Sequence, residues 1–147
     1  MRMRTLLFIL LMAAMAVSGF GQMPIFKRYY VADLPGMAWT ADYYFTHAMH
    51  YVGAAILLAL LGYAAARLAP VAGRITLSGW LRIVLWATIV ATGLLRVLKN
   101  LPDMHLGPEL TLVVDITHLG AVMALGMTAL AVRLVGKSAY VKISRET

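Results

Sequence analysis

The chain has 147 residues, of which 62% are hydrophobic and 13% are charged, and it carries a net charge of +7. So apolar a composition is typical of membrane proteins, and the basic residues lie at the ends of apolar segments rather than in a patch suited to nucleic acid. The absence of cysteine excludes disulfides, thiolate zinc sites, iron–sulfur clusters and covalent c-type haem attachment. Ligands for a metal or cofactor must therefore come from four histidines, ten methionines and six carboxylates.

Four apolar stretches predict helices that cross a membrane, at about 5–21, 43–66, 81–98 and 110–134. A span needs about 20 apolar residues, and lipid offers no partner to an unpaired backbone group, so helices are expected throughout. We therefore predict an all-α integral membrane four-helix bundle that forms a single membrane domain over 1–147, with outer loops at 22–42 and 99–109. We see no internal repeat in the sequence.

The first stretch has two interpretations. Its basic start, short apolar run and small residues at Val17-Ser18-Gly19 also describe a cleavable secretory signal peptide. We favour a retained helix, and cleavage stays open.

The distribution of basic residues predicts the orientation. With the N-terminus inside, nine lysines and arginines flank the inner side: Arg2, Arg4, Arg67, Arg74, Arg82, Arg133, Lys137, Lys142 and Arg145. Four lie on the outer side: Lys27, Arg28, Arg96 and Lys99. This imbalance predicts a multi-pass protein with both termini on the cytoplasmic side of the membrane.

Two histidines on different predicted spans lie at similar depth. At 1.5 Å per residue, His50 is about 9 Å down the second span and His118 is about 12 Å down the fourth. One imidazole from each of two helices can bind the iron of a b-type haem, and small residues near both rings would give a flat macrocycle space. We predict His50 and His118 as haem-iron ligands, with His47 as the alternative to His50.

Three further polar residues are candidates for the same site. Arg96 could pair with a haem propionate or a quinone oxygen, or it could extend to the headgroups, as we expect for Lys99. Asp115 could serve a quinone proton path, pair with Arg96, or be an interfacial carboxylate. His47 could ligate iron, bind a propionate or line a quinone pocket. His105 is expected to be a loop histidine, and the inner half holds no histidine for a second haem.

A four-helix chain with His47 and His50 on its second span, Thr92-Gly93 and Arg96 on its third and His118 on its fourth resembles a known family. It is similar to the small cytochrome b subunits of respiratory membrane complexes, of the formate dehydrogenase gamma and hydrogenase cytochrome b type. Such subunits anchor a complex, carry two b haems and pass electrons between a peripheral partner and quinone. Because the first span here has no histidine and the fourth has one, the resemblance implies a single outer haem.

We therefore expect an electron-transfer subunit of an oxidoreductase complex rather than a stand-alone enzyme. It would bind one haem b near the outer face and exchange electrons with quinone, such as menaquinone, and with an outer multihaem cytochrome c or iron–sulfur protein. One alternative is a haem-free anchor or quinone-site subunit. Another is a proton or metal-ion conduit, which is disfavoured because the polar groups stop in the outer half.

Overall fold

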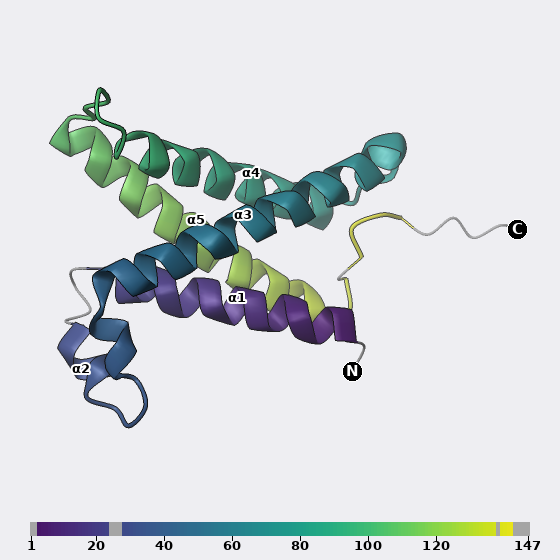
Figure 1. Cartoon of the computed structure of the whole chain (residues 1–147). Coiled ribbons are helices and arrows are strands. Elements are labelled where there is room, and N and C mark those ends of the chain that lie inside the picture. The colour runs from purple at the N-terminus through teal and green to yellow at the C-terminus, as the bar shows by residue number, and fades with distance from the viewer. Residues whose placement is uncertain (1–2, 24–27, 138, 143–147) are drawn as a thin grey trace, which may run out of the picture. The chain divides into compact units, whose positions relative to one another are not determined.

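The computed structural model describes residues 3–23, 28–137 and 139–142 (Figure 1). The long helices are α1 (Met3–Gly21), α3 (Tyr43–Leu68), α4 (Leu77–Leu98) and α5 (Pro108–Leu134). Shorter elements are α2 (Arg28–Ala32) and the 3-10 helices η1 (Ala38–Ala41) and η2 (Ala69–Arg74). Within the described ranges the only extended pairing is one isolated antiparallel bridge, between Ile75 and Val141.

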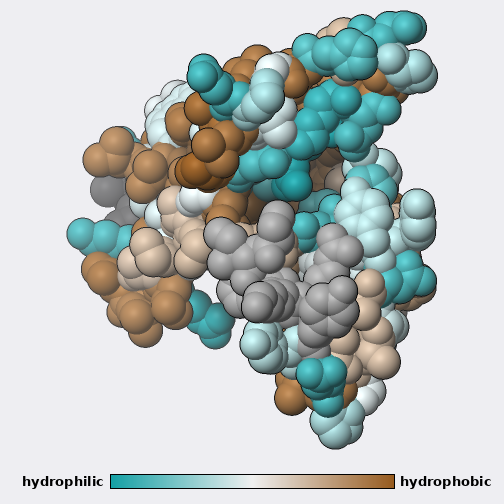
Figure 2. Space-filling view, turned by 90° about the vertical axis from the view of Figure 1, so that its left-hand side faces the viewer, coloured by the Kyte–Doolittle hydropathy of each residue, from teal (hydrophilic) through white to brown (hydrophobic). Residues whose placement is uncertain are grey.

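The predicted all-α fold with four spans is confirmed, since all four long helices are long and apolar enough to cross a membrane. Their large apolar side chains lie on the surface, as with Leu7 at 60% and Ile116 at 62% exposure. Figure 2 shows hydrophobic residues reaching the molecular surface. Such a surface would drive aggregation in water and is suited to lipid contact.

Helix α4 begins at Leu77, one turn before the predicted start at Leu81. The reason is a cap, because the hydroxyl of Thr76 accepts a hydrogen bond from the backbone N–H of Gly79 at 3.0 Å. Helix α5 likewise begins at Pro108 rather than Leu110, with proline at a position where no helical N–H is required. The predicted outer loop 22–42 contains α2 and η1, which pack on each other.

Two compact units make up the chain, residues 1–67 and 68–147, and each is described by itself. The first holds α1, α2, η1 and α3. The second holds η2, α4 and α5. Each unit therefore contains two successive candidate spans: α1 and α3 in the first unit, and α4 and α5 in the second.

In the second unit, the segment that follows α5 packs against the start of α4. The backbone N–H of Thr76 donates to the carbonyl of Tyr140 at 2.9 Å. The guanidinium of Arg82, a side chain only 5% exposed, lies 3.7 Å from the centroid of the Tyr140 ring. This cation–π contact and the bridge next to it hold the segment in place.

We expect Gly79→Ala to loosen that segment, because a Cβ at this position would lie 2.6 Å from the carbonyl oxygen of Tyr140. Overpacking of this kind costs about 1–3 kcal/mol. Hydrogen exchange at the amide of Thr76 should accelerate. Gly73→Ala is the matched control, since nothing lies within 4 Å of a Cβ there, and equal exchange in both variants would contradict the prediction.

Candidate functional site

His50 is held by a buried hydroxyl of α1. Its Nδ1 lies 2.9 Å from the Oγ of Ser18, a residue with no exposed surface. The Ser18 hydroxyl donates its single proton to the carbonyl of Ala14 at 2.7 Å. With that proton engaged, the hydroxyl can accept from Nδ1–H of His50, and in the neutral ring this tautomer leaves Nε2 unprotonated.

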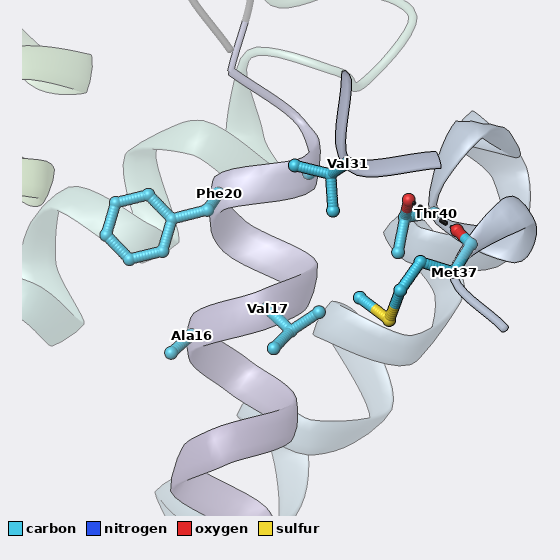
Figure 3. Close-up of a pocket in the computed structure, with 7 residues that line it drawn as sticks. Ala16, Val17, Phe20, Val31, Met37 and Thr40 are labelled. Carbon is cyan, nitrogen blue, oxygen red and sulfur yellow. Dashed lines mark hydrogen bonds between the residues drawn. The ribbon is translucent and has the colours of Figure 1, made fainter. Parts of the chain in front are cut away.

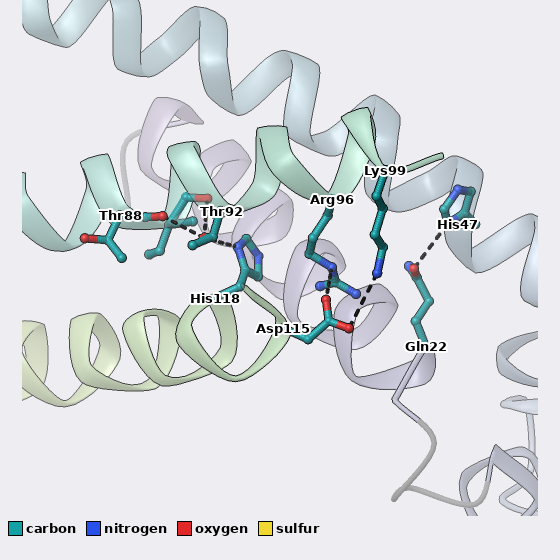
Figure 4. A network of polar contacts seen from close by, with 9 residues as sticks. Gln22, His47, Thr88, Thr92, Arg96, Lys99, Asp115 and His118 are labelled. Atoms are coloured by element: carbon teal, nitrogen blue, oxygen red, sulfur yellow. Dashed lines mark hydrogen bonds and ion pairs between the residues drawn. The ribbon is translucent and has the colours of Figure 1, made fainter. Parts of the chain in front are cut away.

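His118 is held in the same manner in the second unit (Figure 4). Its Nδ1 lies 2.9 Å from the Oγ1 of Thr92, which is 8% exposed. The Thr92 hydroxyl donates to the carbonyl of Thr88 at 2.6 Å. The same arrangement suits an Nδ1–H tautomer of His118, in which Nε2 is the unprotonated nitrogen.

Each ring also lies against a glycine of the partner helix. A Cβ placed on Gly19 would be 3.1 Å from Cε1 of His50, and one placed on Gly93 would be 3.4 Å from Cε1 of His118. These separations are at or inside the lower limit of ordinary van der Waals contact. Because Gly19 and Gly93 have no side chain, the ring of His50 can approach the Ser18 hydroxyl. The ring of His118 can approach the Thr92 hydroxyl for the same reason.

His47 has different surroundings from His50. Its Nδ1 is 3.2 Å from the amide oxygen of Gln22, which accepts the ring proton. Its ring lies between Tyr43 and Tyr51, with centroids 5.2 and 4.2 Å away. His47 is therefore part of an aromatic and amide cluster, where sequence reasoning left a ligand, a propionate contact and a quinone contact open.

Asp115 pairs with two cations of α4 and the residue after it (Figure 4). Arg96 Nε is 3.0 Å from Asp115 Oδ1, and Lys99 Nζ is 3.6 Å from Oδ2. Oδ1 makes no hydrogen bond within the described residues, so the Arg96 contact is a charge pair without hydrogen-bond alignment. Of the partners considered for Asp115, Arg96 is the one found. Lys99 turns its ammonium group toward Asp115, and its extension to the headgroups stays a prediction. The cluster keeps one net positive charge.

The predicted site residues fall in both units. His47 and His50 belong to the first, and Arg96, Asp115 and His118 to the second. The matched depth of the two predicted ligands stays a prediction. His105 lies exposed in the loop before α5, as expected.

Sequence reasoning missed Ser18 and Gln22 as contacts of the histidines, and it noted Thr92 without its role. The available signal was a hydroxyl residue followed by glycine, at Ser18-Gly19 on α1 and at Thr92-Gly93 on α4, although Ser78-Gly79 on α4 shows the same pair without a histidine contact.

A cavity of about 360 Å³ lies between α1, α2 and η1 (Figure 3). Its walls are almost wholly apolar, and the residues that line it are Ala16, Val17, Phe20, Gly21, Val31, Met37 and Thr40. No predicted site residue lines this cavity, so it lends no support to the predicted haem site.

Over the described residues there is no group of three or more histidine, cysteine or acidic side chains that could hold a metal ion. Comparison with protein-family models, curated proteins and solved structures finds no match for this chain. The resemblance to cytochrome b subunits therefore depends on the few residues that carry it.

Proposed function

We propose that this chain is the membrane subunit of a respiratory redox complex, in which His50 and His118 bind the iron of one b-type haem near the outer face. It passes electrons between quinone and an outer redox partner, a multihaem cytochrome c or an iron–sulfur protein. The site lies in the bacterial inner membrane, with both chain termini on the cytoplasmic side.

The observation that supports this proposal is the state of the two imidazoles. Each lies on an apolar helix long enough to span a membrane, and the Nδ1 of each is 2.9 Å from a buried hydroxyl oxygen. Ionisable residues in such helices are functional candidates by default. A histidine that ligates a metal characteristically donates its other ring N–H to a fixed acceptor, which sets the tautomer and raises the basicity of the ligand nitrogen.

The donor set fits a haem. His50 and His118 would hold the iron through two imidazoles, a ligand pair that suits haem. When bound, the haem supplies one-electron chemistry at the iron. Arg96 and Lys99 retain a net positive charge around Asp115, which suits a propionate or a quinone oxygen.

The test is a spectrum of the purified full-length chain. We expect a reduced-minus-oxidised spectrum of b type and one pyridine haemochrome per chain, and a menaquinol analogue should reduce the bound haem. A colourless protein would contradict the proposal and leave the haem-free anchor. Ion flux into liposomes by that colourless protein would instead support the conduit.

The proposed orientation rests on the charge imbalance, of which Arg2, Lys27 and Arg145 lie outside the described residues. Because the chain has no cysteine, single cysteines can report sidedness without background. In whole cells, a membrane-impermeant maleimide should label Asp103→Cys, which is exposed between α4 and α5, and spare Gly73→Cys, which is exposed in η2. The reverse labelling pattern would contradict the proposed orientation. It would mean that the histidines lie nearer the cytoplasmic face.

A further inference from the structure

The two units contain the same arrangement of contacts around a histidine. In each, a buried hydroxyl lies 2.9 Å from Nδ1 of an imidazole on the next long helix: Ser18 to His50, and Thr92 to His118. In each, the hydroxyl donates to the carbonyl four residues before it, and the glycine that follows it lies against Cε1 of the ring.

The correspondence extends by one helical turn. Four residues after Ser18, Gln22 contacts His47, which is three residues before His50. Four residues after Thr92, Arg96 contacts Asp115, which is three residues before His118. Both contacts fit helix pairs that run antiparallel, so Gln22 corresponds to Arg96 and His47 corresponds to Asp115.

The buried positions repeat in the same register. The buried residues of α3 lie at −4, +3 and +7 from His50, and those of α5 lie at −4, +3 and +7 from His118. They are Thr46, Gly53 and Leu57 on α3, and Val114, Ala121 and Leu125 on α5. The side chains differ at every one of these positions, so the sequence displays no repeat where the structure has one.

We infer that the two helix pairs are copies of one imidazole-presenting module, in which Ser18 and Thr92 are positioning residues. Each hydroxyl accepts from Nδ1–H and fixes the tautomer that leaves Nε2 as the ligand nitrogen. His50 is then the counterpart of His118, whereas His47 takes the place of Asp115 and is not a ligand. The inference rests on the proposed function only for the identity of the group that Nε2 binds.

The number of protons available at each hydroxyl favours one tautomer of the ring beside it. A hydroxyl has one proton, and an oxygen–oxygen separation of 2.6–2.7 Å to a carbonyl requires that proton to lie between the two oxygens. The carbonyl has none to give. We therefore expect the proton of each neutral ring on Nδ1, whichever group binds at Nε2.

The experiment is solid-state nitrogen NMR of the full-length chain in lipid, labelled with ¹⁵N-histidine and produced with haem synthesis suppressed. Signals are assigned by their loss in His50→Gln and His118→Gln. We expect both rings to be neutral with the proton on Nδ1. Thr92→Val should move His118 toward the Nε2–H tautomer and leave His50 unchanged, whereas Thr92→Ser, which keeps the hydroxyl, should preserve the wild-type signal. Ser18→Ala and Ser18→Thr should act on His50 alone in the same way.

A wild-type His118 or His50 with its proton on Nε2 overturns the inference without any variant. So does an unchanged His118 tautomer in Thr92→Val. If Thr92→Val does not accumulate, Thr92→Ser in the haem-loaded protein replaces it: the wild-type reduction potential supports the positioning role, and loss of the low-spin spectrum contradicts it. Protein that shows both Nδ1–H tautomers but never a b-type spectrum removes the proposed function and leaves this inference intact.

Discussion

His118→Ala is expected to abolish the b-type spectrum of the purified protein, with haem content reduced by at least about tenfold. We expect this loss because alanine has no nitrogen that could bind iron. Within the described residues of the same unit, no other histidine lies within a helical turn of His118 to replace it. Haem content by pyridine haemochrome, normalised to protein, is the measurement. Helicity by circular dichroism shows whether the variant still folds.

The equivalent change at His50 should have the same effect, and the change at His47 should not. His47→Ala removes a contact to the Gln22 amide but leaves the hydroxyl-held ring of His50 in place. His105→Ala, at an exposed loop position, is the control for general effects of losing a histidine. Loss of haem in His47→Ala with retention in His50→Ala would exchange the two assignments and contradict the repeat.

The spans could be predicted from the sequence because hydrophobic length is a property of each segment alone. The exact start of α4 could not, since Thr76, Ser78 and Gly79 interrupt the apolar run while the Thr76 cap extends the helix backwards. A cap acts through the side chain of one residue, so it leaves little trace in a hydropathy pattern.

The histidines could be singled out from the sequence, but their partners could not. Ser18 looked like a small residue near a cleavage site, yet its buried hydroxyl lies 2.9 Å from Nδ1 of His50. Which residue of one helix faces which residue of another depends on their register, and a hydroxyl–glycine pair has meaning only after that register is known. For Asp115, the sequence could name Arg96 as one of several partners, and packing selected it.

Asp115→Asn and Arg96→Gln are expected to shift the reduction potential of the haem in opposite directions. Asp115→Asn leaves Arg96 and Lys99 without their counter-charge, so added positive charge favours the reduced state and raises the potential. Arg96→Gln leaves Lys99 and Asp115 as a neutral pair, which lowers it. For one charge about 10 Å away in a medium of effective dielectric about 20, the Coulomb energy is roughly 1.7 kcal/mol, or about 70 mV for one electron.

A potentiometric titration of each variant in the same lipid measures the two shifts, and Gln22→Glu offers a matched change in the first unit. Because Gln22 corresponds to Arg96 in the repeat, a negative charge there should lower the potential without touching the Asp115 cluster. A general loosening of the helix pair would move Asp115→Asn and Arg96→Gln in the same direction, since both variants lose the same charge pair. Opposite shifts therefore require an electric field at the redox group, whereas shifts of one sign would mean that Arg96 and Asp115 only hold α4 to α5.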